Sequence, residues 1–156
     1  MTYRIESLDS ATRILFGFTA GFIATLTLNQ LTVLILWRLG LAPFDAYSMA
    51  RNSVGAPQVL SFAFWGGIWG ILFSFVDRRF PAHTGYWVTA FLFGAVLLSS
   101  VFLLVVLPLK GQPVGGGWHL PLLLTAFLAN GAWGIGTGLI LKGPSRWLSR
   151  QRHAPA

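Results

Sequence analysis

The sequence predicts an all-α membrane protein in which a single domain of 156 residues crosses the bilayer as four transmembrane helices. Three observations predict this fold class. Residues of hydrophobic type make up 54% of the chain and charged residues only 10%, whereas a soluble domain needs far more charge to cover its surface. Four long stretches carry no charge at all, and the basic residues stand at their ends. Helices are required because an isolated strand would leave its backbone unpaired in lipid.

Each uncharged stretch has about 20 residues, the length that a helix needs to cross the hydrocarbon core. In chain order, the predicted spans cover approximately residues 14–37, 58–76, 85–107 and 119–141. The first stretch is too long for the core of a signal peptide and no small-residue cleavage site follows it, so we expect it to remain in the mature protein. Residues 142–156 form a basic tail, which we expect to lie on anionic lipid headgroups.

The basic residues are distributed unequally between the two sides of this topology. Four spans place both termini and the turn at residues 77–84 on one side of the membrane. That side carries eight Lys and Arg residues and the other side three: Arg4, Arg13, Arg78, Arg79, Lys142, Arg146, Arg150 and Arg152 against Arg38, Arg51 and Lys110. The positive-inside rule therefore predicts cytoplasmic termini. The net charge of +7 reports orientation and contact with membrane lipids, and we expect no nucleic-acid partner.

Small residues recur at steps of four along the predicted spans, in the GxxxG manner. Such spacing places them on one helix face and lets two helix backbones approach closely, which is how helices associate in lipid. We expect these faces to point inward and the large apolar side chains to face lipid. The candidate packing residues are Gly17, Gly21, Gly66, Gly70, Gly94, Gly134 and Gly138.

A second set of residues is polar and lies deep in the predicted spans: Asn29, Gln30, Ser99, Ser100 and Asn130. An amide without a partner in hydrocarbon costs several kcal/mol, so each must find a hydrogen bond or water. Two interpretations are open. The polar side chains pair helices, at about 0.6 kcal/mol per contact. Alternatively, they line a polar cavity near mid-membrane that opens outward and holds water or a neutral solute.

The chain contains a short internal repeat. Gly67-Ile-Trp-Gly-Ile71 is followed 64 residues later by Gly131-Ala-Trp-Gly-Ile135, and the same offset superposes the second span on the fourth. This pattern favours two tandem helical hairpins, related by an axis along the membrane normal. The alternative is a chance match in a chain rich in Gly and Trp.

Tryptophans and the first long loop allow further predictions. Trp37, Trp87, Trp118 and Trp147 fall near span ends and indicate an interfacial aromatic belt. We expect Trp65, Trp69 and Trp133 to pack against glycines of neighbouring helices, the alternative being an aromatic pocket for a ligand. In the loop after the first span, the spacing of Phe44, Tyr47 and Arg51 predicts a short interfacial helix, with an irregular loop as the alternative.

The sequence lacks the residue patterns that proton or ion transport, metal binding and catalysis require. No charged residue lies inside a predicted span, which argues against a proton pump or a carrier of charged substrates. The chain has no cysteine, and His83, His119 and His153 are isolated from one another. No metal-ligand spacing or nucleophile-base arrangement is present. We therefore expect no enzyme activity, no metal and no cofactor.

Three segments carry a resemblance to known proteins. Residues 55–70 (GAPQVLSFAFWGGIWG), 108–113 (PLKGQP) and 130–134 (NGAWG) resemble a group of small, uncharacterised bacterial inner-membrane proteins with four helices. The resemblance spans most of the chain and implies four spans in the cytoplasmic membrane of a bacterium. It implies no activity and no site residues.

Two functional hypotheses follow. The first is a structural or accessory membrane subunit, which packs as a homo-oligomer or within a larger membrane complex; it is favoured because every sequence feature has a packing explanation. The second is a small passive transporter or channel for a neutral solute. Four short helices enclose little volume, so transport would require a dimer.

Overall fold

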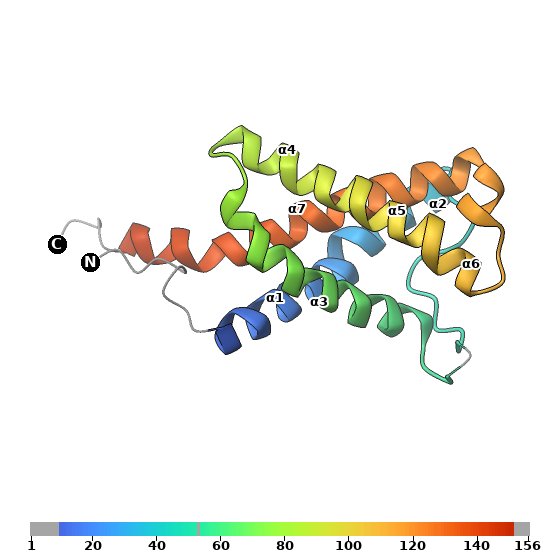
Figure 1. Cartoon of the computed structure of the whole chain (residues 1–156), viewed down its shortest axis with the longest axis horizontal. Coiled ribbons are helices and arrows are strands. Elements are labelled where there is room, and N and C mark those ends of the chain that lie inside the picture. Colours follow the sequence, from blue (N-terminus) through green and yellow to red (C-terminus); the bar gives the residue numbers. More distant parts are fainter. Residues whose placement is uncertain (1–9, 53, 152–156) are drawn as a thin grey trace.

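The computed structural model describes residues 10–52 and 54–151, with side chains as far as residue 143. The chain is 80% helical and, over the described residues, contains no strand (Figure 1). Within this part of the chain, four helices are long and apolar enough to cross a membrane, and they are numbered here as the first to fourth span: Ser10–Arg38, Gln58–Arg79, Thr84–Leu109 and Leu120–Gly143. The prediction of an all-α chain with four such helices is confirmed.

The first and third spans are composite helices. The first joins α1 (Ser10–Ala24), a π-helical turn (Thr25–Asn29) and α2 (Gln30–Arg38). The third, in chain order, joins α4 (Thr84–Leu92), a π-helical turn (Phe93–Leu98), α5 (Ser99–Val101), a second π-helical turn (Phe102–Val106) and α6 (Leu107–Leu109). A π-helical turn accommodates one extra residue and shifts the face that the following residues present.

The second and fourth spans have no π-helical turn. The second is α3 (Gln58–Val76), continued by a 3₁₀ turn at Asp77–Arg79. The fourth lies in α7 (Leu120–Gln151), which follows a tight turn at Val114–Trp118 where three glycines and Trp118 have positive φ. Helix α7 continues ten residues beyond the predicted end of the fourth span at residue 141. The basic side chains of the tail from residue 144 onward lie outside the described residues.

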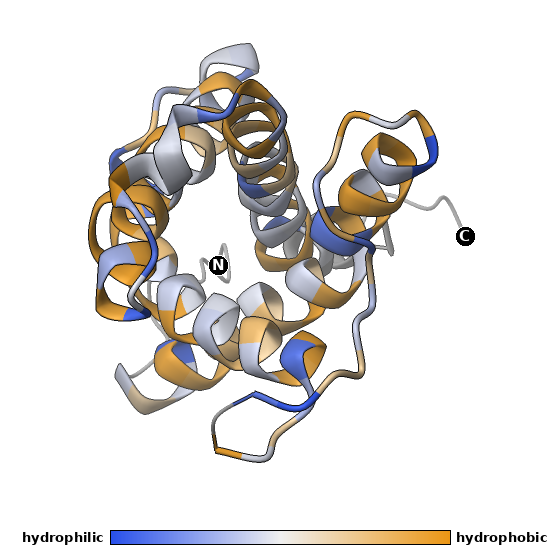
Figure 2. Cartoon of the chain, turned by 90° about the vertical axis from the view of Figure 1, so that its right-hand side faces the viewer, coloured by the Kyte–Doolittle hydropathy of each residue, from blue (hydrophilic) through white to orange (hydrophobic). Residues whose placement is uncertain are grey.

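The loop between the first two spans is irregular, so the predicted interfacial helix at Phe44, Tyr47 and Arg51 is wrong. Tyr47 has a positive φ of 55°, a conformation that cannot continue a right-handed helix. Its backbone N–H donates to the Gln30 side chain at 2.7 Å rather than to a helical carbonyl. Figure 1 shows this loop connecting the end of α2 to the beginning of α3, and Figure 2, which views the molecule from that side, shows hydrophobic residues predominating along the helices.

The spans pack in the order second, first, fourth, third around the bundle. The contact between α1 and α3 is the most extensive, α7 packs against both α1 and the third span, and α3 has little contact with α7. One end of the bundle carries the beginning of α1, the end of α7 and the 77–84 turn, and is called the terminus end. The opposite end carries residues 39–57 and 110–119, and is called the loop end (Figure 1).

Glycines bring the first and second spans into backbone contact. A Cβ atom added at Gly21 would collide with the Gly66 carbonyl oxygen and lie 2.8 Å from the Gly70 Cα, and one added at Gly17 would lie 2.8 Å from the Gly70 carbonyl oxygen. Real Cβ atoms do not approach other heavy atoms so closely. The two helices can therefore meet at this distance only because all four positions are glycine.

The third and fourth spans meet in the same way. A Cβ atom added at Gly94 would collide with the Asn130 carbonyl oxygen, and one at Gly134 with the Ala90 carbonyl oxygen. Gly138 differs, since an added Cβ would meet the Tyr86 ring at 3.0 Å rather than a backbone. All seven candidate packing glycines thus lie against a neighbouring span of the same chain.

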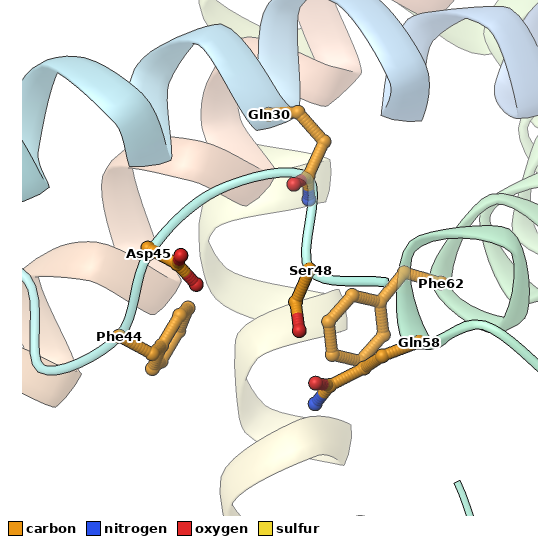
Figure 3. A pocket seen from close by; sticks show the side chains of 6 residues that line it. All are labelled: Gln30, Phe44, Asp45, Ser48, Gln58 and Phe62. Atoms are coloured by element: carbon orange, nitrogen blue, oxygen red, sulfur yellow. The ribbon is translucent and has the colours of Figure 1, made fainter. Parts of the chain in front are cut away.

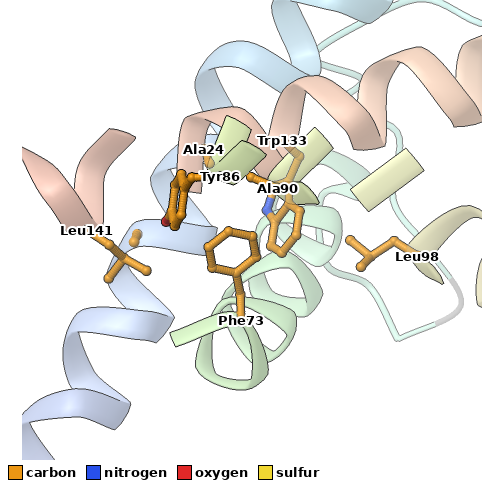
Figure 4. Close-up of a cluster of buried hydrophobic side chains, with 8 residues drawn as sticks. Ala24, Phe73, Tyr86, Ala90, Leu98, Trp133 and Leu141 are labelled. Atoms are coloured by element: carbon orange, nitrogen blue, oxygen red, sulfur yellow. The ribbon is translucent and has the colours of Figure 1, made fainter. Parts of the chain in front are cut away.

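Aromatic side chains fill the middle of the bundle (Figure 4). Phe73, Tyr86 and Trp133, from the second, third and fourth spans, are the largest fully buried side chains, with exposed fractions of 0%, 2% and 1%. The Phe73 ring packs edge-on against Trp133 at 6.0 Å and against Phe93 at 5.3 Å between centroids. These contacts join the second span to the third and fourth spans, which its backbone hardly touches.

The outward surface carries large apolar side chains, among them Ile14, Leu31, Ile35, Phe64, Trp65, Ile68, Leu72, Val96 and Leu139. Trp65 is 59% exposed, so the prediction that it packs against a glycine is wrong. Trp69 is partly buried against the aromatic core. Two tryptophans one helical turn apart therefore have different environments, because only the inner one reaches the neighbouring spans.

Replacing Gly21 by alanine should destabilise the protein by about 1–3 kcal/mol, since the added methyl overpacks a backbone contact. The helix propensity of alanine, better than that of glycine by about 1 kcal/mol, offsets part of this loss. Thermal unfolding in mild detergent, followed by tryptophan fluorescence, measures the change. Gly143→Ala is the matched control, because an added Cβ there meets nothing within 4 Å. A melting temperature for Gly21→Ala at or above that of Gly143→Ala would contradict the packing account.

Candidate functional site

Four of the five predicted polar residues form one hydrogen-bonded chain across three spans. The Gln30 side-chain NH₂ donates to the Asn29 side-chain oxygen at 3.2 Å, and the Asn29 NH₂ donates to the Asn130 side-chain oxygen at 3.3 Å. The Asn130 NH₂ donates to the Ser99 hydroxyl at 3.1 Å, and that hydroxyl donates to the Ala126 carbonyl at 2.9 Å. We call these residues the amide network. It links the first, third and fourth spans.

The helix geometry around Thr25–Asn29 determines where the amide network begins. Thr25 and Thr27 donate their hydroxyls to the carbonyls of Gly21 and Ile23, a side-chain bond that bends helices. The π-helical turn that contains them ends at Asn29. Beyond α1, which packs on α3, this turn and α2 present their polar residues to α7. The change of face thus turns Asn29 toward Asn130.

The amide network is tied to the loop end through Tyr47. The Gln30 side-chain oxygen accepts the Tyr47 backbone N–H, and the Tyr47 hydroxyl donates to the Leu26 carbonyl at 3.1 Å. The sequence does not reveal this role of Tyr47, because the spacing of Tyr47 from Phe44 predicts a helix face instead. Ser100, the fifth predicted polar residue, is half-buried and makes no side-chain hydrogen bond to any described residue.

A small cavity of about 80 Å³ lies beside the amide network at the loop end (Figure 3). Its lining comes from α2, the loop 39–57 and the beginning of α3: Gln30, Phe44, Asp45, Ser48, Gln58 and Phe62. Of the five predicted cavity residues, Gln30 alone lines it. The structure therefore places this cavity under the loop, whereas Asn29, Ser99 and Asn130 bond to one another beside it.

A charged cluster at the terminus end was missed by sequence reasoning, and it corrects the statement that the spans carry no charge. Each span contributes one member: Arg13, Asp77, Tyr86 and Lys142. Arg13 lies within α1, because this helix begins at Ser10, before the uncharged stretch begins. Its side chain is only 6% exposed. The predicted spans are defined as stretches without charged residues, so their sequences do not reveal this cluster.

Contacts within the charged cluster bring its one carboxylate close to its two basic side chains. The Tyr86 hydroxyl donates to the Asp77 carboxylate at 3.4 Å, and the charges of Lys142 and Arg13 both act on that carboxylate. The Lys142 ammonium lies 2.9 Å from the Tyr86 ring centroid. Arg13 also donates to the Ser74 carbonyl at 3.4 Å. The arrangement joins all four spans at the terminus end.

Trp133 supplies one further polar link inside the bundle. Its indole N–H donates to the Gly21 carbonyl at 3.0 Å, and this oxygen also accepts the Thr25 hydroxyl at 2.9 Å. A buried indole N–H needs an acceptor. The fourth span thus also reaches the close contact of the first two spans at Gly21. Trp133 packs against a glycine of a neighbouring helix, as predicted from the sequence.

The described residues contain no group of three or more His, Cys, Asp or Glu side chains that could hold a metal ion. Comparison of the chain with protein-family models, with curated proteins and with solved structures finds no match. The amide network, the cavity and the charged cluster are therefore the structural features that bear on function.

A double-mutant cycle on Asn29 and Asn130 should show coupling of about 0.6 kcal/mol, and not above about 1.7 kcal/mol, as for other hydrogen bonds between helices in membranes. The single variants Asn29→Leu and Asn130→Leu each leave a partner amide unpaired, whereas the double variant removes both. Unfolding free energies in mixed detergent micelles provide the measurement, with Ser100→Ala as the control outside the network. Strict additivity of the two single changes would contradict the contact.

Proposed function

We propose that the chain is a non-enzymatic, multi-pass protein of the bacterial cytoplasmic membrane that serves as a structural or accessory subunit, as a homo-oligomer or within a larger membrane complex. The observation that carries this proposal is the filled interior of the bundle. Phe73, Tyr86 and Trp133 close its middle, and each is at most 2% exposed. A protein that conducts a solute needs a polar path past this level, and none of these side chains offers one.

The pairing of the amides supports the same proposal. No side-chain nitrogen or oxygen that is fully buried in the described part of the chain lacks a hydrogen-bond partner. Polar residues left free to bind a solute would be expected to face a shared hydrated space. The members of the amide network instead pair with one another, with the Tyr47 N–H and with the Ala126 carbonyl, which is the behaviour of polar contacts that fix helices in register.

Partner contacts in this proposal use the outward apolar side chains. The glycine faces already pack the spans of one chain against each other, so they are not open to a second protein. The outward face of α3 carries Leu60, Phe64, Trp65, Ile68 and Leu72. Such side chains contact lipid or a neighbouring helix equally well, and their aromatic rings supply dispersion contacts that lipid tails supply less well.

The proposed topology places both termini and the charged cluster in or near the cytoplasm. The eight basic residues on that side against three on the other support it. Exposed apolar residues along all four spans support insertion, because a soluble protein would cover them.

We also propose that the bundle consists of two tandem hairpins. Gly66 and Gly70 of the second span correspond to Asn130 and Gly134 of the fourth, 64 residues later. Gly66 and Gly70 pack against Gly21 and Gly17, whereas Asn130 and Gly134 pack against Gly94 and Ala90. Gly94 lies 73 positions after Gly21, and Ala90 lies 73 positions after Gly17. Corresponding positions of the two halves thus make corresponding backbone contacts, which supports a duplicated unit over a chance match.

Passive transport of a neutral solute is the second candidate function. The observation that favours it is the cavity beside Gln30, which brings an outward opening to one end of the amide network. The path would have to continue past Asn130 and through the aromatic core. Because that core is packed, transport ranks second.

The topology can be tested directly because the chain has no cysteine of its own. Val54→Cys, at a position 83% exposed in the first loop, should react with a membrane-impermeant maleimide applied to intact cells. Ala82→Cys, in the short turn at the other end, should react only after the membrane is permeabilised. The reverse pattern would invert the proposed orientation, and labelling of both positions in intact cells would exclude it.

Purification from native membranes in mild detergent should yield an assembly larger than one chain, with a fixed ratio of subunits. Mass spectrometry of the intact assembly measures that ratio. A stoichiometric partner protein supports the accessory role, whereas a homo-oligomer without a partner favours the transport alternative, which requires a dimer. A monomer with bound lipid only would contradict the proposed assembly.

A further inference from the structure

The cavity at the loop end gathers hydrogen-bond acceptors between two aromatic rings. Figure 3 shows the Asp45 carboxylate, the Ser48 hydroxyl and the Gln58 amide turned toward one space, with the rings of Phe44 and Phe62 beside it. The cavity, about 80 Å³, exceeds the roughly 15 Å³ that a single water molecule requires. It can therefore hold a small chemical group.

Asp45 gives the cavity its charge. It is the only acidic residue in the segments 39–57 and 110–119, which form the loop end. Its carboxylate makes no hydrogen bond or ion pair with any described residue, and the Gln58 side-chain amide makes none either. The Gln30 oxygen, in contrast, is already bonded to the Tyr47 N–H. Two unpaired polar groups thus face the cavity and can bind a ligand without breaking a protein contact.

The lining selects the class of ligand. A carboxylate with hydroxyl and amide oxygens attracts a cation that can donate hydrogen bonds, and aromatic faces attract an organic ammonium group. A divalent metal ion would need six or more oxygen ligands, and the two phenyl rings occupy directions from which such ligands would come. A primary ammonium group has three N–H donors, one for each of Asp45, Ser48 and Gln58.

A second charge lies next to the cavity. The Lys110 ammonium is 6.0 Å from the centroid of the Phe62 ring, so a cation stands beside a cavity that itself attracts cations. A ligand with an ammonium group and a nearby anion would match both charges. Phosphoethanolamine has this pattern, and the loop end lies at the headgroup level in the proposed topology, with Trp37 and Trp118 at the adjacent span ends.

We propose that this cavity binds the primary ammonium group of phosphoethanolamine, with Asp45 as the counter-charge and Lys110 close to the phosphate. Two sources carry this chemistry, the headgroup of phosphatidylethanolamine and soluble phosphoethanolamine. The lipid source rests on the proposed membrane insertion. Because Gln30 lines the cavity and also belongs to the amide network, an occupied cavity would hold the loop 39–57 against the first span.

Retention of lipid by the full chain tests the proposal. The purified protein in detergent is exposed to phosphatidylethanolamine or to phosphatidylcholine with identical acyl chains, and bound lipid is counted by native mass spectrometry. Ethanolamine headgroups should be retained at least about tenfold more strongly, because choline cannot donate hydrogen bonds. Asp45→Asn keeps the shape of an exposed side chain and should remove most of this preference. Phe44→Leu should weaken the preference for ethanolamine headgroups several-fold, because it removes one of the two aromatic rings.

The matched control is Asp9→Asn, which removes the same charge near the N-terminus, on the opposite side in the proposed topology. Equal retention of the two lipids, or an unchanged preference in Asp45→Asn, would overturn the proposal. Competition by soluble phosphoethanolamine identifies the soluble source, and its failure while the lipid stays bound identifies the lipid; both outcomes support an ammonium site. The unsubstituted protein could show no lipid preference while Val54→Cys and Ala82→Cys label as the proposed topology requires. That result would overturn this inference alone and leave the proposed function standing.

Discussion

The backbone contact between the first and second spans underlies the packing of the whole bundle. In lipid, no hydrophobic effect drives helices together, so the stability of a bundle comes from close packing and from hydrogen bonds between helices. Gly17 and Gly21 meet Gly66 and Gly70 without side chains between them. That approach exposes the Gly21 carbonyl to the Trp133 indole, which fixes the fourth span. The fourth span in turn holds the third through Gly94 and Gly134.

This packing has consequences at both ends of the bundle. At the terminus end, the spans are close enough for Arg13, Asp77, Tyr86 and Lys142 to interact, so charges that would be costly alone are compensated. Toward the loop end, the π-helical turn at Thr25–Asn29 changes the face of the first span and directs Asn29 to the fourth. The filled aromatic core lies between these two polar layers, and it is the observation on which the proposed structural role rests.

The fold class and the inward faces could be predicted from the sequence because they follow from local properties. Uncharged length predicts a span, and small residues at steps of four predict a packing face whatever their partner. The pairing of Asn29 with Asn130 could be suspected from cost alone, since an intramembrane amide needs a partner. The cavity was misplaced because its lining depends on the path of the loop 39–57, and the positive φ of Tyr47 leaves no periodic signal. The charged cluster escaped prediction because its members are far apart in sequence and meet only through span packing.

The interior of the bundle is closed by its aromatic core. The most direct test is the permeability of liposomes that contain the purified chain, measured by stopped-flow light scattering with small neutral solutes such as glycerol and urea. The account predicts permeability equal to that of protein-free liposomes of the same lipid composition. Permeation that depends on the protein and disappears in Asn29→Leu and Asn130→Leu would contradict it, and would establish the amide network as part of a solute path.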